Sequence, residues 1–247
     1  MTNSRQRLDV LLVERALAPS RDRARALVMA GAVFVAGNRV DKPGTTIPRD
    51  AAIEVRGSDH PWVSRGGLKL AHALETFALD VTGAVALDVG ASTGGFTDVL
   101  LQGGAARVYA VDVGHGQLAW ALRNDARVVV LERTNARTLT DREIPEPVDV
   151  IVCDASFIGL RTVLPAALAL AASGTRLVAL IKPQFEAGKG RVGKGGVVRD
   201  PAVHAEVCET IREWLERDCG WTVMGLTESP ITGPAGNKEF LIAARRD

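Results

Sequence analysis

The chain has 247 residues, the size of one full α/β domain plus a small module. Apolar residues make up 47% of it and charged residues 24%, which excludes a disordered or fibrous protein. The 30 basic and 29 acidic residues nearly cancel, so the total charge does not indicate a nucleic-acid-binding protein. Residues 1–60 nevertheless carry +3 and the remainder −2, which places any basic surface at the N-terminus.

The cysteines and histidines predict neither a disulfide framework nor a metal site. The three cysteines form no C-x-x-C pair, and the four histidines show no H-E-x-x-H spacing. The N-terminus lacks the apolar region of a signal peptide. The most apolar stretch, residues 163–172, contains Pro165 and is too short to cross a bilayer. We therefore expect a cytoplasmic protein that does not associate with membranes.

Residues 7–30 predict two short helices. The second, Arg21 to Ala30, has Ser20 as its N-cap and Gly31 at its end. Arg21 and Arg25 lie four residues apart and share one helix face. Cations near a helix N-terminus are unfavourable against the helix dipole, so we expect an anion to lie against these arginines.

Short strands follow these helices. Residues 33–35 alternate toward Gly37-Asn38, a hairpin-turn signal, and residues 53–55 predict another strand. His60-Pro61 begins a linker. The sequence thus predicts a small α+β domain over residues 1–60, a linker over 61–66 and a second domain over 67–247.

Strands and helices alternate through the second domain. The predicted strands are Val85–Val89, Arg107–Val111, Val128–Leu131, Val148–Cys153, Arg176–Ile181, Thr222–Leu226 and Glu239–Ala243. The predicted helices are Gly67–Phe77, Thr93–Leu101, Gln117–Arg123, Leu164–Ala172 and Pro201–Arg217. Apolar strands separated by helices indicate an α/β fold, a Rossmann-like parallel sheet covered on both faces. The last two strands have no helix between them and should form an antiparallel pair at the sheet edge.

The turn after the first strand of this domain predicts a nucleotide-like cofactor. Its sequence, G-A-S-T-G-G from Gly90, differs from the dinucleotide G-x-G-x-x-G. Asp88 just before it would repel a pyrophosphate and suits a cationic amino-acid group. Asp112, at the end of the second strand, would meet ribose hydroxyls. These features favour S-adenosylmethionine over NAD; the alternative is a tight turn that binds no ligand.

Four charged residues are candidates for catalysis. Asp154 and Lys182 follow strands, Glu239 opens the last strand, and Lys69 lies on the helix before the first. Each alone is more typical of a solvated charge or a local ion pair. Together they would meet at the carboxyl edge of the sheet, where open α/β sheets bind ligands. A lysine beside a second positive charge gives up its proton more readily and can act as a base.

Five sequence blocks identify a family. They are Arg65-Gly66-Gly67-x-Lys69-Leu70, Asp88-x-Gly90-Ala91-Ser92-Thr93-Gly94-Gly95-Phe96-Thr97, Glu132-Arg133-Thr134-Asn135-Ala136-Arg137, Lys182-Pro183-Gln184-Phe185-Glu186 and Gly196-Val197-Val198. Over essentially its whole length the chain resembles the hemolysin-A (TlyA) family of ribosomal-RNA 2′-O-methyltransferases. The resemblance implies an N-terminal RNA-binding domain, of the kind named for a ribosomal small-subunit protein, and an FtsJ-type methyltransferase domain.

The resemblance also implies roles for particular residues. Lys69, Asp154, Lys182 and Glu239 match the family's Lys-Asp-Lys-Glu tetrad, with Lys182 as the expected base. The expected S-adenosylmethionine-binding residues are Asp88, Gly90, Ser92, Gly94, Asp112, Asn135 and Ala136.

Basic residues in three regions predict contacts to RNA. The loop 186–200 combines five glycines with basic side chains, which suits contacts to phosphates. The alternative is that these residues are ordinary solvated charges on the surface. The residues expected to contact RNA are Arg21, Arg23, Arg25, Arg39, Arg65, Lys189, Arg191 and Lys194.

The sequence therefore predicts S-adenosylmethionine-dependent 2′-O-methylation of a ribose, a cytidine by resemblance, in 16S or 23S ribosomal RNA or both. After Asp154 the chain lacks the two prolines typical of amine methylation, and Cys153 should face the sheet packing. One alternative is a catalytically silent rRNA-binding or ribosome-assembly factor, which a missing tetrad residue would favour. Another is a membrane-lytic hemolysin, which neither a transmembrane helix nor a series of ten-residue alternating strands supports.

Overall fold

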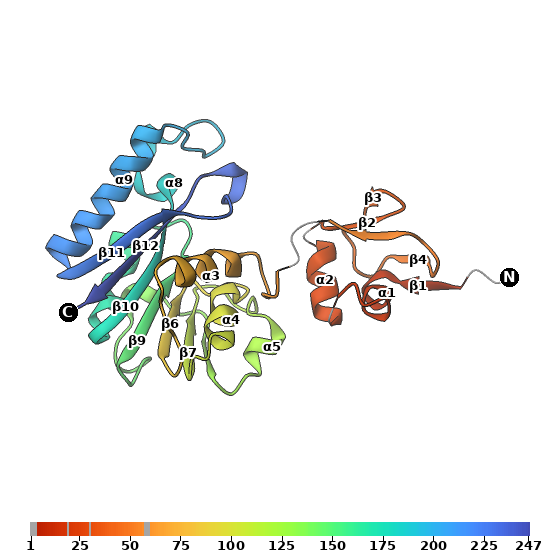
Figure 1. Ribbon diagram of the computed structural model, residues 1–247, viewed down its shortest axis with the longest axis horizontal. Coiled ribbons are helices and arrows are strands. Elements are labelled where there is room, and N and C mark those ends of the chain that lie inside the picture. The colour runs from red at the N-terminus through yellow and green to blue at the C-terminus, as the bar shows by residue number, and fades with distance from the viewer. Residues whose placement is uncertain (1–3, 19, 30, 57–59) are drawn as a thin grey trace. The chain divides into compact units, whose positions relative to one another are not determined.

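The computed structural model describes residues 4–18, 20–29, 31–56 and 60–247. The chain divides into two compact units, Met1–Val63 and Ser64–Asp247 (Figure 1). The boundary lies within the segment 61–66 that the sequence marks as a linker. Each unit has its own apolar core.

The N-terminal unit packs two helices, α1 (Leu8–Glu14) and α2 (Arg21–Met29), against short strands. These strands are β1 (Arg5–Arg7) paired with β4 (Thr46–Pro48), and β2 (Val33–Val35) paired with β3 (Asn38–Arg39) and β5 (Ile53–Val55). The Ser20 hydroxyl accepts a hydrogen bond from the Arg23 backbone N–H at 3.2 Å, so the predicted cap of α2 is confirmed.

The hairpin turn lies one residue earlier than predicted. A two-residue hairpin turn of the favoured kind needs positive φ at both central residues. Ala36 (φ +48°) and Gly37 (φ +80°) supply it, and Asn38 is already the first residue of β3.

The C-terminal unit is built on one seven-stranded mixed sheet with the order β11-β12-β10-β9-β6-β7-β8. The strands are β6 (Val85–Val89), β7 (Arg107–Val111), β8 (Val128–Leu131), β9 (Val148–Cys153), β10 (Ala171–Ile181), β11 (Trp221–Glu228) and β12 (Phe240–Arg246). β10, β9, β6, β7 and β8 run parallel, while β12 pairs antiparallel with both β10 and β11. The predicted parallel sheet and its antiparallel edge pair are confirmed.

Helices connect these strands. They are α3 (Gly66–Thr76), α4 (Gly95–Gln102), α5 (Trp120–Arg123), α6 (Leu160–Val163), α7 (Pro165–Ala169), α8 (Pro183–Glu186) and α9 (Pro201–Glu213), with a π-helical turn at Trp214–Asp218 and 3₁₀ turns at Ala136–Thr138, Lys189–Arg191 and Pro234–Gly236. The predicted helix Leu164–Ala172 is wrong at its end. Ala171 already pairs with Val148 of β9, and a register shift before Arg176 absorbs the Ser173-Gly174 step. Helical spacing does not reveal a strand that begins with two alanines.

The sheet is covered on both faces. Leu87 and Val89 of β6 pack in one cluster with residues of α6, α7 and α9. On the other face α4 lies over β6, where Thr97 contacts Asp88, and α3 lies beside α4 (Figure 1). The ends of β6, β7, β9 and β10 therefore open on a common edge, and β12 starts at that edge because Phe240 pairs with Ile181.

Candidate active site

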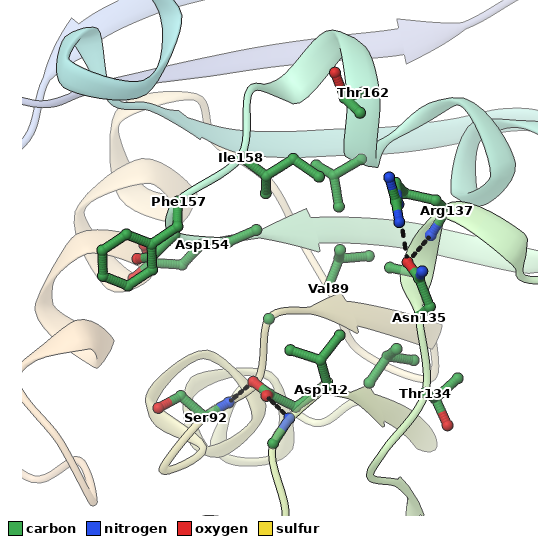
Figure 2. Close-up of a pocket in the computed structure, with 18 of the residues that line it drawn as sticks. Val89, Ser92, Asp112, Thr134, Asn135, Arg137, Asp154, Phe157, Ile158 and Thr162 are labelled. Atoms are coloured by element: carbon green, nitrogen blue, oxygen red, sulfur yellow. Dashed lines mark hydrogen bonds between the residues drawn. The ribbon is translucent and has the colours of Figure 1, made fainter.

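A cavity of about 870 Å³ lies at the carboxyl ends of β6, β7 and β9 (Figure 2). Its walls combine apolar side chains with a few polar groups, as is usual for a site that binds a small molecule. Of the predicted cofactor residues, five line it: Gly90, Ser92, Asp112, Asn135 and Ala136.

Asp112 holds two loops of this cavity in place. Its Oδ2 accepts the backbone N–H of Ser92 at 2.8 Å, and its Oδ1 accepts that of Gly114 at 2.6 Å (Figure 2). Ser92 itself has a left-handed backbone (φ +49°). The carboxylate thus joins the glycine-rich turn to the segment after β7. In the segment after β8, which also lines the cavity, Asn135 Oδ1 accepts the Arg137 backbone N–H at 3.1 Å.

Gly90 is a position where the backbone tolerates no side chain. Its φ is +86°, and a Cβ there would lie 2.9 Å from Ala155 Cα. The glycine-rich turn after β6 and the loop after β9 therefore meet at van der Waals distance, and this contact fixes the floor of the cavity.

We expect Gly90→Ala to weaken cofactor binding about tenfold or more, because the two loops must separate. Gly83→Ala is the matched control. Gly83 has φ +72° but open space around its Cβ direction, and it lies at the other end of β6. The Gly83→Ala substitution should lower the stability by about 1 kcal/mol through backbone strain and leave the cofactor affinity unchanged. Calorimetry with S-adenosylmethionine measures both variants; equal affinities would remove Gly90 from the site.

Two predicted cofactor residues do not line this cavity. Asp88 is fully buried beneath the turn, where its Oδ2 accepts the Thr97 hydroxyl at 2.7 Å. Burial raises its pKa to about 7. The Cβ direction of Gly94 (φ +99°) points at Leu118 and Leu122. Both residues shape the turn from below, and the motif alone did not distinguish this role from direct contact.

A second cavity of about 230 Å³ brings the four predicted catalytic residues together. Lys69 Nζ lies 2.8 Å from Glu239 Oε2 and 3.4 Å from Asp154 Oδ2. Lys182 Nζ lies 2.6 Å from Asp154 Oδ1. Lys69, Lys182 and Glu239 are buried. Arg65, another predicted site residue, also lines this cavity and is exposed.

The arrangement of the tetrad differs from the expected pair of adjacent lysines. The Asp154 carboxylate lies between the two ammonium groups, with one oxygen toward each. The chain thus pairs two buried cations with two carboxylates, which keeps the cluster near neutral. Gly90, Ser92, Asp154 and Ser156 line both cavities, so the tetrad cavity adjoins the larger one.

Two residues that organise the site are not predicted by the sequence patterns. Ser156 Oγ accepts a hydrogen bond from Lys182 Nζ at 2.8 Å. Glu186 Oε1 accepts the Leu160 backbone N–H at 2.7 Å, and burial raises the pKa of this carboxyl. Glu186 thereby ties α8, which follows Lys182, to the loop after β9. Glu186 lies in the sequence block that begins at Lys182, and Ser156 lies two residues after Asp154. Sequence spacing does not show which loop either side chain reaches.

The predicted basic face of α2 is organised by a buried carboxylate. Asp9 is fully buried and contacts Arg7 Nε at 2.9 Å, Arg21 Nη2 at 3.1 Å and Arg25 Nε at 3.3 Å. These guanidinium groups hold the pKa of Asp9 well below its usual range. Asp9 is the anion expected against Arg21 and Arg25, and the three arginines remain about half exposed.

Arg23 and Arg39 have other surroundings. Arg23 donates to the backbone oxygens of Trp62, at 2.8 Å, and His60, at 2.7 Å, so it holds the end of its own unit rather than extending the Asp9 cluster. Arg39 lies exposed on β3 with its guanidinium over Gly31.

The loop 186–200 is anchored at its far end. Asn237 Oδ1 accepts the Val198 N–H at 3.1 Å, and Asn237 Nδ2 donates to the Gly196 oxygen at 3.0 Å. Arg191 forms an ion pair with Glu206, which lowers its availability for RNA. Lys194 is exposed, and the side chain of Lys189 lies outside the described part of the structure.

Within the described residues, no helix is long and apolar enough to cross a bilayer. The same residues contain no group of three or more histidine, cysteine or carboxylate side chains arranged to hold a metal ion.

Comparison with known proteins shows the relationships of both units. The FtsJ-like methyltransferase family matches residues 62–246, and the S4 domain family matches residues 6–53. A rRNA methyltransferase candidate of Bacillus subtilis, YqxC, is 50% identical over 98% of this chain and 86% of its own length. The 16S/23S rRNA (cytidine-2′-O)-methyltransferase TlyA of Mycobacterium tuberculosis is 51% identical over 98% and 90%. A solved structure of a candidate hemolysin from Streptococcus thermophilus has a TM-score of 0.77 at 43% identity, covering 99% of this chain and 90% of that one.

Proposed function

The chain belongs to the hemolysin-A (TlyA) family, which joins an S4 domain to an FtsJ-like methyltransferase domain, and we propose that it methylates a ribose 2′-hydroxyl of ribosomal RNA with S-adenosylmethionine. We further propose that it is a cytoplasmic enzyme whose residues 1–60 bind RNA and whose residues 67–247 hold the cofactor and the reacting ribose. One observation carries the proposal: the complete tetrad lies in a cavity that shares a wall with a cofactor-sized one.

The larger cavity fits S-adenosylmethionine. Its volume of about 870 Å³ is in the range of cofactor sites. The side chain of Asp112 supplies a carboxylate for ribose hydroxyls, and Asn135 and Ala136 line the wall beyond it. Gly90 keeps the turn free of a side chain at the boundary with the tetrad cavity. When bound, this cofactor supplies a methyl group already activated by the positive sulfur.

The tetrad can supply the base and the alignment that this methyl transfer needs. A ribose hydroxyl is a weak nucleophile until it loses its proton, so the enzyme needs alignment and a base more than an acid. We assign proton removal to Lys182, which lines the tetrad cavity and contacts Asp154 and Ser156, two residues that line both cavities. Asp154 holds Lys182, while Glu239 and Asp154 together hold Lys69 beside the ribose.

The same residues favour methylation of ribose over methylation of a base. Attack through a pyrimidine ring carbon needs a thiolate, and burial raises the pKa of the Cys153 thiol to about 12. Cys153 also packs into the sheet core, as the sequence predicts. Asp154-Ala155-Ser156-Phe157 contains no proline to present a backbone carbonyl to a base amine.

The test is the position of the methyl group in the product. Isolated 30S subunits, 50S subunits and naked rRNA are incubated with the protein and labelled S-adenosylmethionine, and the digested nucleosides are analysed by mass spectrometry. We expect the label on the sugar fragment of a cytidine, and resistance to alkaline cleavage at that nucleotide. Label on the base fragment, or on none of the three substrates, would overturn the proposal.

The Asp9 cluster predicts how the N-terminal unit contributes to RNA affinity. Replacing Arg21 and Arg25 with glutamine removes two half-exposed positive charges while Arg7 still pairs with Asp9. We expect weaker RNA binding, with a salt-dependence slope that falls by about 1 for every phosphate that is no longer neutralised. The control Arg217→Gln removes a 74% exposed arginine from the π-helical turn after α9 and should leave the slope unchanged. Equal slopes for all three proteins would make the cluster a solvated surface.

A further inference from the structure

Ser156 occupies the junction between the two cavities. Ser156 lines both the large cavity and the tetrad cavity, and it is exposed. Any group that passes from cofactor to ribose crosses this boundary. Ser156 is therefore close to where the reacting oxygen must lie, although it belongs to neither the tetrad nor the predicted cofactor set.

The loop that carries Ser156 is fixed on both sides. The Asp154 N–H donates to the Val89 oxygen at 3.1 Å, and the Leu160 N–H donates to Glu186 at 2.7 Å. The close packing of Ala155 on Gly90 fixes the loop from below. A side chain presented by such a loop keeps its place without its own bonds, so the contact of Ser156 with Lys182 is not needed to hold the loop.

The contact with Lys182 has a specific geometry. Nζ of Lys182 donates to Ser156 Oγ at 2.8 Å and to the Asp154 backbone oxygen at 3.1 Å, and pairs with Asp154 Oδ1 at 2.6 Å. An amine that accepts a proton has two N–H bonds and one lone pair. Three acceptors surround Nζ, one more than a neutral amine has hydrogens, so the 2′-hydroxyl must replace one of them. The Asp154 backbone oxygen makes the longest contact; with that contact replaced, Ser156 Oγ and Asp154 Oδ1 take the two hydrogens and the lone pair faces the hydroxyl. The serine hydroxyl keeps its own hydrogen, which is free to donate to the substrate.

We propose that Ser156 is a positioning residue that aims the Lys182 amine at the ribose 2′-hydroxyl and donates its own hydrogen bond to an oxygen of that ribose. The inference rests on the proposed function. In the transfer step the 2′-hydroxyl proton passes to Lys182 Nζ and a bond forms between the 2′-oxygen and the methyl carbon. The carbon–sulfur bond breaks with its electron pair on sulfur. Ser156 gains and loses no proton overall.

The decisive comparison is Ser156→Thr against Ser156→Val. The two side chains have the same shape and differ in a hydroxyl against a methyl group, and the exposed position accommodates either. We expect the threonine variant to keep a kcat near that of the wild type and the valine variant to lose about 10- to 100-fold. Dissociation constants for S-adenosylmethionine and RNA should be similar in both variants. A role confined to loop stability would not separate these two variants.

Ser156→Ala should behave as the valine variant, and Ser173→Ala as the wild type. Ser173 is an exposed serine near the opposite end of β10, the strand that leads to Lys182. Equal kcat values for the threonine and valine variants, in an enzyme that does form 2′-O-methylcytidine, would overturn this inference alone. A wild-type protein that places no methyl on ribose would overturn the proposed function with it.

Discussion

Replacing Lys182 with methionine should lower the rate of methyl transfer by about 10²- to 10⁴-fold, the usual cost of losing a general base. Methionine keeps an unbranched apolar stem in a position that is only 5% exposed, so the packing at the end of β10 is retained. Asp154 keeps Lys69 as a partner at 3.4 Å and is not left as an isolated buried charge. Binding of S-adenosylmethionine and RNA should therefore change by no more than several-fold. Single-turnover transfer to RNA measures the effect.

Two further variants sharpen this result. Lys182→Arg keeps a positive charge but cannot give up its proton near neutral pH. It should be as inactive as the methionine variant if Lys182 removes the proton, and much more active if the charge alone orients the hydroxyl. Lys238→Met is the matched control, because Lys238 is exposed, pairs with Glu228 and adjoins Glu239 in sequence. Near-normal turnover of the methionine variant would show that the base assignment is wrong.

The protein should lose stability as pH rises from about 5 to 8, because of Asp88. Burial raises the pKa of this carboxyl to about 7, with the hydrogen bond from Thr97 acting in the opposite direction. Between the ordinary aspartate value and about 7, the folded protein keeps a proton that the unfolded chain has released. Stability therefore falls with rising pH across that window and is lowest above it, with a total change of at most about 4 kcal/mol. Urea unfolding at pH 5 and pH 8 measures it.

Asp88→Asn isolates this contribution. An amide does not ionise, so the variant should lose much less stability between the two pH values. The carboxyl of Glu186 also has a raised pKa and contributes to the remaining dependence. Asp9 and Glu132 have lowered values and titrate below the window. Asp141→Asn, at an exposed position, should match the wild type. An Asp88→Asn protein with the full wild-type dependence would contradict the prediction.

The scaffold of this site is predictable from the sequence. β6, β7, β8 and β9 have the predicted bounds because each is a short apolar run between turn residues. Since parallel strands end at one edge, the residues that follow them could be expected to meet there. The tetrad met as predicted, although Lys69 and Glu239 are 170 positions apart in the chain.

The sequence does not predict which of two neighbouring surfaces a side chain contacts. The position of Asp88 in β6 puts its side chain on the face under α4, toward Thr97, rather than into the cavity above. Arg23 differs from Arg21 and Arg25 because it is offset around α2 and reaches the carbonyls of His60 and Trp62. The roles of Ser156 and Glu186 depend on which loops approach each other across the sheet edge. Such choices are set by tertiary packing and leave no periodic pattern.

The position of β12 also bears on how the protein is made. This strand is inserted between β10 and β11, although it is the last of the three in the chain. During synthesis one edge of β10 therefore stays unpaired until residues 240–246 emerge. Until then β11 also lacks β12, the strand with which it pairs. Pairings of such long sequence separation form slowly, and open edges favour association between chains. The nascent chain should thus be more prone to aggregation before β12 appears than after β12 has paired. Lys69 acquires Glu239 at the same moment, so the pairing of β12 and the assembly of the tetrad occur together.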